Sequence, residues 1–269
     1  MFSTLGQIFR DNWEWRGQIW RLAVTELQKE VRGAALGWIW LILTPAIWIT
    51  VFWFGLVIGL RTGSPVDGVP YLAWLAVGIV PWFFMSNMLS TGTNVYRRYP
   101  YLVNRVRFPR AVISSFYATA RFVVFLATMV LVAVVFIVTR VHLTIYAVQA
   151  PFIAILMLLF WATWSLLMSP LSALSKDFHN LLKAMTTPLF WLSGTIFNVA
   201  RIKYEWIKWV LAFNPITFFV TSFRAALCED YWVWNDRRML VGFLLVFVVV
   251  ILAALRSQAR LAGEIADVL

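Results

Sequence analysis

Charged residues are scarce in this chain: only 13% of its 269 residues are Asp, Glu, Lys or Arg, whereas 62% are hydrophobic. The mean hydropathy is +0.79. A soluble protein of this length could not keep so much apolar surface from water. The composition therefore excludes a water-soluble globular protein and indicates a chain that lies in a lipid bilayer.

The chain has only one cysteine and no nucleotide-binding motif. The single cysteine, Cys228, excludes a disulfide within the chain. No stretch matches the phosphate-binding pattern G-x-x-x-x-G-K-[S/T]. No secretory signal peptide is expected, because the first 30 residues carry many charges. Any energy source other than an ion gradient must therefore come from a partner chain, and the sequence predicts no cofactor in this one.

The apolar stretches contain hardly any ionisable side chains. No Asp or Glu lies inside them to relay protons or sodium ions, and both histidines, His142 and His179, fall in loops. No carboxylate pair or metal-ligand cluster appears, which argues against an ion-coupled carrier and a membrane-embedded hydrolase. Arg121 is the one charge clearly inside a stretch, so it is either a functional residue or a side chain that snorkels to the interface.

What the sequence does have is six long apolar stretches, at residues 33–60, 71–90, 111–139, 145–172, 181–199 and 239–255. Each is near or above the roughly 20 residues that a helix needs to cross a hydrocarbon core of about 30 Å. We therefore expect an all-α membrane protein with six transmembrane helices, in a membrane domain that covers residues 33–269.

In the segment 1–32, residues 4–32 have a helical period without being a span. Their apolar side chains fall within one sector of about 100°, and most of the charged ones lie on the other side. A helix with tryptophans on one face and charges on the other suits the membrane interface. We expect an N-terminal amphipathic interface helix in contact with membrane lipids. The alternative is a soluble cap on the membrane domain.

Lys and Arg predict the orientation. Five basic residues precede the first stretch and five more follow the second, whereas the first two loops expected on the other side carry only Arg61 and Arg140. The last loop on that side, residues 200–238, breaks the pattern with six basic residues, which four acidic ones partly balance. This pattern predicts a multi-pass protein of the cytoplasmic (inner) membrane with both termini cytoplasmic. The net charge of +11 is then explained by basic loops next to anionic headgroups, and nucleic acid is not expected as a partner.

Residues 200–230, between the last two stretches, are apolar but interrupted by Asn214-Pro215. Proline disfavours a helical conformation at the residue before it. We expect a re-entrant outer helical hairpin, which is tolerated at membrane depth only where protein or a water-filled cavity surrounds it. The alternative is an amphipathic hairpin on the surface.

Aromatic residues are abundant, with 16 Trp, 22 Phe and 8 Tyr. Those inside the stretches are either packing residues or a lining whose faces stack on sugar rings. The basic, aromatic loop at residues 94–108 could form a short helix from Pro100 to Phe108 that docks on a cytosolic partner. A loop that only binds headgroups is the alternative.

An ordered set of short motifs resembles one family. It comprises Glu26-Leu-Gln-Lys-Glu-Val-Arg32, Leu36-Gly37-Trp38-Ile39-Trp40 with Pro45, Gly78-Ile-Val-Pro-Trp82, Asn104 to Pro109, Lys176-Asp177 and Asn214-Pro215. The set covers essentially the whole chain and resembles the ABC-2 type exporter permeases. It is nearest to the branch that exports lipid-linked O-antigen, teichoic acid or capsule polymers. Lys176 stands where many members have Arg, and the region of Ser193-Gly194 lacks a proline often seen there.

The resemblance implies a homodimer with two copies of a separate cytoplasmic ATPase, which carries the ATP and Mg²⁺. It implies that residues 94–108 form the coupling helix, with contacts from Tyr96, Tyr99, Tyr101, Leu102 and Arg105. It implies an outer gate with Trp206, Trp209, Asn214, Pro215 and Arg224. The expected substrate path, for a lipid-linked glycan polymer, carries the aromatic residues Trp40, Trp48, Trp53, Phe83 and Trp191.

The function that these residues favour is the non-enzymatic permease subunit of an ATP-driven polysaccharide exporter. One alternative is an ABC-2 permease for a drug or small lipid, whose path should be narrow and greasy rather than wide and aromatic. The other is a membrane enzyme or scaffold acting on lipid-linked sugar. That reading needs catalytic carboxylates at the interface, and only Asp177 and scattered outer acids are available.

Overall fold

The computed structural model describes residues 2–33, 35–61, 63–66, 68–104 and 108–261. Within these ranges the chain is helical and contains no β-strand. The helices, in chain order, are α1 (Phe2–Glu14), α2 (Arg16–Val31), α3 (Ile39–Trp53), α4 (Tyr71–Ser90), α5 (Val95–Arg98), α6 (Pro100–Val103), α7 (Arg110–Thr139), α8 (Ala150–Leu174), α9 (Lys176–Leu192), α10 (Glu205–Ala212), α11 (Pro215–Leu227) and α12 (Arg237–Leu261). A π-helical segment, Phe54–Gly59, continues α3.

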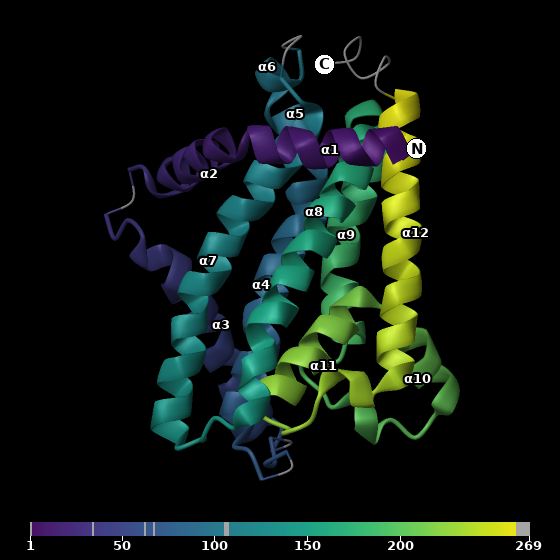
Figure 1. Cartoon of the computed structure of the whole chain (residues 1–269). Helices are drawn as coiled ribbons and strands as arrows, with labels where there is room; N and C mark the ends of the chain where they lie inside the picture. The colour runs from purple at the N-terminus through teal and green to yellow at the C-terminus, as the bar shows by residue number, and fades with distance from the viewer. Residues whose placement is uncertain (1, 34, 62, 67, 105–107, 262–269) are drawn as a thin grey trace.

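The long helices form one bundle with a different set of short elements at each end (Figure 1). At the first end α1 and α2 lie across the bundle, close to α5, α6 and the last turns of α12. At the opposite end lie α10 and α11. We call these the α1 end and the α10 end. The arrangement places the basic segment between α4 and α7 at the same end as the N-terminal helices.

The helices differ in how much of their surface the bundle covers. Most residues of α4 are buried, because α4 packs against α3, α7, α9 and α11. In α3 only Pro45 and Ile49 are buried. Large apolar side chains cover the rest of α3, including Ile47, Trp48 and Val51, and all three are exposed. The helix α4 is thus the centre of the bundle, and α3 is its open side.

Four predicted stretches agree closely with helices of span length. Residues 71–90 coincide with α4, residues 111–139 begin one residue inside α7, and residues 145–172 fall within the helical segment Ile145–Leu174. The last stretch, 239–255, lies inside α12, which is longer at both ends. The agreement follows from continuous apolar composition, which the bilayer requires over the whole span.

The first stretch is shorter than predicted, and its start is wrong. Gly33 and Gly37 have φ values of 82° and 50°, in the left-handed region that a helix cannot contain. The chain therefore turns between α2 and α3, and α3 begins at Ile39. Of the predicted first stretch, only Ile39–Gly59 is helical and long enough to span.

The fifth stretch, predicted at residues 181–199, corresponds to the 17-residue α9, which has other bounds and is not among the helices long enough to span. The helix α9 begins at Lys176, where the Ser175 hydroxyl accepts a hydrogen bond from the Phe178 amide at 3.2 Å. It ends at Leu192, shortly before Gly194 with a φ of 75°. By length and composition, five helices of the described chain can cross a membrane, or six if α10 and α11 form one broken span.

The N-terminal helix and the helix in the loop after α4 are shorter or more interrupted than predicted. Residues 1–32 hold two helices, α1 and α2, with Trp15 between them. Of the helix predicted from Pro100 to Phe108, Pro100–Val103 forms the four-residue α6, and residues 105–107 lie outside the described residues. A four-residue helix has few internal hydrogen bonds, so its position depends on packing.

Candidate functional site

The segment predicted to couple to an ATPase is mostly interior. Tyr96, Tyr99 and Leu102 are each at most 5% exposed. The Tyr99 ring packs edge-on against Phe116 of α7 at 5.0 Å, and Gln258 of α12 donates a hydrogen bond to the Tyr96 hydroxyl at 3.2 Å. The expectation that these three side chains form an exposed docking face is therefore wrong. Tyr101 is 53% exposed, and Arg105 lies outside the described residues.

The same segment is tied to the bundle through its arginines. Arg97 donates two hydrogen bonds to the carbonyl of Ala173 at the end of α8, at 2.6 and 3.1 Å. Arg98 pairs with Glu26 of α2 at 2.7 Å, and Glu26 is only 3% exposed. The segment thus connects α2 to α8. Movement transmitted to it would reach both helices.

Arg121, which the sequence left open between two roles, is buried and paired. Its Nη2 lies 2.8 Å from Glu30 Oε2, and its Nη1 donates to Glu30 Oε1 at 3.0 Å. Glu30 follows Glu26 by one helical turn, so α2 directs two carboxylates to arginines of two other segments. The spacing of four residues was visible in the sequence, but the partners were not, because they lie 72 and 91 residues away.

The predicted path residues form two groups. Trp40 and Phe83 line a cavity of about 170 Å³ between α3, α4 and α7, together with Arg121. Trp48 of α3 stacks on Phe52 at 5.6 Å, and Phe52 meets Trp191 of α9 at 6.4 Å. Trp48 and Trp191 are exposed at the bundle surface.

Sequence reasoning missed two aromatic residues that hold the second group together. Phe52 also meets Phe190 of α9 at 5.1 Å, and Phe190 meets Trp82 of α4 at 5.2 Å. Trp53 is half-buried and packs against the core. The result is an aromatic surface over α3 and α9 that rests on an aromatic core.

At the α10 end, the break between α10 and α11 is built by the predicted Asn214-Pro215. The Asn214 side chain accepts a hydrogen bond from the Ile216 amide at 3.0 Å, and Pro215 occupies the first helical position of α11. Asparagine is a favoured N-cap and proline a favoured first residue. The two helices meet at 96°. Trp206 and Trp209 of α10 are exposed.

Arg224 of α11 has a different position from the other predicted gate residues, because it is 1% exposed. Its guanidinium donates to the carbonyl oxygens of Gly194, Thr195 and Trp74, at 2.6, 2.5 and 3.3 Å. Gly78 of α4 leaves the room for it, since a Cβ there would collide with Arg224 and with the Thr195 carbonyl. These contacts join α11 to α4 and to the turn after α9.

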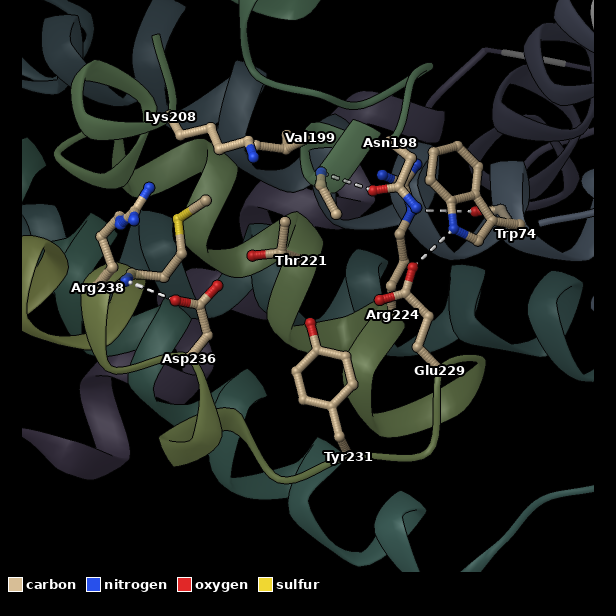
Figure 2. A pocket seen from close by; sticks show the side chains of 12 residues that line it. Trp74, Asn198, Val199, Lys208, Thr221, Arg224, Glu229, Tyr231, Asp236 and Arg238 are labelled. Carbon is tan, nitrogen blue, oxygen red and sulfur yellow. Dashed lines mark hydrogen bonds between the residues drawn. The ribbon is translucent and has the colours of Figure 1, made fainter. Parts of the chain in front are cut away.

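Next to Arg224 lies a cavity of about 280 Å³ with a polar lining (Figure 2). Trp74, Arg224 and Glu229 meet on one side of it, where the Trp74 indole donates to Glu229 at 3.0 Å. Lys208, Arg238 and Asp236 lie on the other side. Burial and the nearby carboxylates Glu229 and Asp236 raise the pKa of the Tyr231 phenol above its ordinary value.

These features define an integral membrane protein, built from several helices of span length, with no nucleotide-binding motif in its sequence. The sequence pattern of ABC-2 type transporters matches residues 17–228, which is most of the chain. The chain belongs to this family, and the resemblance seen in the motifs is confirmed. Family membership makes it the membrane subunit of a transporter and implies a partner ATPase subunit.

Two similar proteins are O-antigen export permeases. The chain is 23% identical over 249 residues to the O-antigen export system permease protein RfbA of Myxococcus xanthus, covering 92% of this chain and 94% of the relative. It is 20% identical over 200 residues to the O-antigen export system permease protein RfbA of Klebsiella pneumoniae, covering 74% and 75% of the two chains.

Proposed function

We propose that this chain is the permease subunit of an ATP-driven exporter that moves a lipid-linked cell-surface polysaccharide across the cytoplasmic membrane. The observation that carries the proposal is the match to an O-antigen export permease over 92% of this chain and 94% of that relative. O-antigen is the first candidate for the polymer, and teichoic acid or capsule-like polymers are the others. ATP binding and hydrolysis belong to the partner ATPase.

In this proposal α1 and α2 are the interface helices of the cytoplasmic membrane surface. Phe9, Trp13 and Trp20 support this placement, because all three are more than half exposed although they are apolar. Side chains of this kind are stable at the boundary between headgroups and acyl chains. Both termini then lie in the cytoplasm, on the side of the basic segment between α4 and α7.

The aromatic surface over α3 and α9 is the proposed path, shared between two copies of the chain. Support comes from its exposure: Trp48 and Trp191 are 48% and 52% exposed in the single chain. An aromatic face stacks on a sugar ring without a strong directional demand, so a long polymer can slide over it. A second copy facing α3 would enclose this surface.

The ATPase contact is proposed at the segment of α5 and α6. Tyr101 is its exposed aromatic residue, while the buried Tyr96, Tyr99 and Leu102 hold the segment against the bundle. The hairpin of α10 and α11 is proposed to re-enter the membrane from outside and to gate the exit. The 96° break at Asn214-Pro215 supports it.

The direct test is transport in membrane vesicles that contain the chain and its co-expressed ATPase. We expect ATP-dependent movement of a lipid-linked glycan polymer, and no movement when the ATPase is inactivated. Export of a dye or short lipid with no transport of polymer would instead establish the small-lipid alternative. Chemical change of the lipid-linked sugar without ATP would instead establish the alternative of a membrane enzyme that acts on lipid-linked sugar.

A further inference from the structure

The cavity between α3, α4 and α7 has a charged end and aromatic walls. It occupies about 170 Å³, and Glu30 and Arg121 provide its charges. Trp40 and Phe83 form its aromatic part, and Asn87 adds a polar side chain. Such a lining suits a molecule with an anionic group next to a ring or an apolar chain.

Arg121 retains an unused hydrogen-bond donor in this cavity. Its side chain is 6% exposed, and Nη1 and Nη2 both contact the Glu30 carboxylate. The Nε atom is buried and has no hydrogen-bond partner among the described residues. Because buried donors are nearly always paired, this atom has a hydrogen bond to give to a bound group or a water molecule in the cavity.

The two members of the ion pair are not equally fixed. Glu30 is 37% exposed and lies in the last turn of α2, three residues before Gly33 with its left-handed backbone. Arg121 is in the middle of α7, eleven residues after its start, and is almost fully enclosed. An anion that competes for the guanidinium would therefore displace the glutamate and leave the arginine in place.

We propose that this cavity binds the phosphate of a phosphorylated lipid. Arg121 binds the phosphate, and the phosphate displaces the Glu30 carboxylate from Arg121. A phosphate offers several oxygens to the planar guanidinium group, so it can take the place of the Glu30 carboxylate on Arg121. The group next to the phosphate lies against Trp40 and Phe83. The inference deepens the proposed function, on which it rests, by naming the phosphate of the lipid-linked substrate as the part recognised here.

A lipid is favoured over a soluble phosphate by the position of Arg121. Arg121 pairs with Glu30 of α2, the proposed interface helix, so the cavity lies where lipid headgroups meet the protein. The other residues around the cavity are largely apolar, including Leu41, Pro45 and Val124. A phosphate attached to a lipid would be held at this cavity by its acyl or prenyl chain.

The test is equilibrium binding to the purified full-length chain in detergent, with dioctanoyl phosphatidic acid as the probe. Dioctanoylglycerol, which lacks the phosphate, is the control lipid, and inorganic diphosphate is the soluble control. We expect Arg121→Gln to weaken phosphatidic acid binding by about tenfold or more, the loss of one charge-assisted hydrogen bond. We expect Glu30→Gln to strengthen it by about threefold, because the competing carboxylate is removed.

The opposite signs of the two variants distinguish a site from a structural ion pair. If Glu30→Gln weakens binding as Arg121→Gln does, or if Arg121→Gln binds like the parent chain, the proposal is overturned. The double variant Arg121→Gln/Glu30→Gln contains no unpaired charge and guards against misfolding, and it should also bind weakly. Equal binding of inorganic diphosphate would overturn the assignment to a lipid.

The result separates this inference from the proposed function. If the two variants have opposite effects on binding but the chain moves no polysaccharide, the phosphate site stands and the proposed glycan substrate is rejected. If the parent chain exports polysaccharide but the Arg121 variant binds phosphatidic acid normally, the proposed export function stands and the proposed phosphate site is rejected.

Discussion

Arg224 of α11 places its guanidinium carbon 3.2 Å from the ring centre of Trp74 of α4 and donates a hydrogen bond to the carbonyl of the same residue. The two residues are 150 positions apart in the chain. This contact, with the bonds to Gly194 and Thr195, fixes α11 to the centre of the bundle. If the outer segment opens, we therefore expect α10 to move and α11 to stay with α4.

Gly78 should be essential for this packing. In Gly78→Ala the new methyl group would overlap the guanidinium of Arg224, and we expect a loss of about 1–3 kcal/mol in stability from overpacking. The measurement is thermal unfolding of the purified protein in detergent. Gly55→Ala is the matched control, because a Cβ at Gly55 meets nothing within 4 Å. Equal unfolding temperatures for the two variants would show that Arg224 does not depend on this space.

Tyr99 and Tyr101 should respond differently to truncation. Tyr99→Ala removes a buried ring that packs on Phe116, so we expect a loss of stability of about 3 kcal/mol or more. Tyr101→Ala removes an exposed ring and should leave stability unchanged while it lowers ATP-dependent export. Unfolding temperature and transport are measured on both variants. Normal export by a stable Tyr101→Ala protein would argue against an ATPase contact at this residue.

The exposed aromatic surface should set the rate of polymer export. Replacing Trp48 and Trp191 with Leu keeps hydrophobic bulk but loses the stacking face, so export of long polymer should slow by about 2- to 10-fold per residue. Trp161→Leu is the control, because Trp161 is buried and its loss should affect protein stability instead. Leu variants that export as fast as the parent chain would favour the small-lipid alternative.

Restricting α10 should block export. Single cysteines at the exposed positions Trp206, Val210 and Phe213 can be introduced after Cys228→Ala removes the only native thiol. Crosslinking two copies through one of them should stop polymer export, without affecting ATP binding by the partner ATPase, and reduction should restore it. Transport that continues after complete crosslinking would reject a gate at α10.

The orientation can be measured in the same cysteine-free background. Leu143→Cys should react with a membrane-impermeant reagent in intact spheroplasts, because Leu143 is exposed and the connection between α7 and α8 lies at the α10 end (Figure 1). Tyr101→Cys should react only after the membrane is opened. The reverse pattern would place the termini outside the cytoplasm.

Much of the fold was predictable because its signals are local. The bounds of α4 and α7 agreed with the apolar stretches to within one residue. Asn214-Pro215 indicated the break between α10 and α11, because capping and proline geometry depend on neighbouring residues. The family motifs were also read in order along the chain, and the family match over residues 17–228 confirmed them.

Helix ends were harder to predict where glycine interrupts an apolar stretch. Hydropathy does not change at Gly33, Gly37 or Gly194, yet their left-handed backbone ends the helical geometry. The start of the first predicted span and the end of the fifth were wrong for this reason. A bilayer constrains composition over a whole stretch, whereas a single backbone torsion decides where a helix stops.

By itself, then, the sequence determined that the chain lies in a membrane, where most of its spans fall and to which family it belongs. Only the tertiary structure decided that Tyr99 is interior and Tyr101 exposed, that Glu30 pairs with Arg121, and that Arg224 is enclosed by carbonyl oxygens. The physical reason is range. Bilayer insertion depends on the summed hydropathy of adjacent residues, while burial and pairing depend on side chains brought together from segments 29 to 150 positions apart.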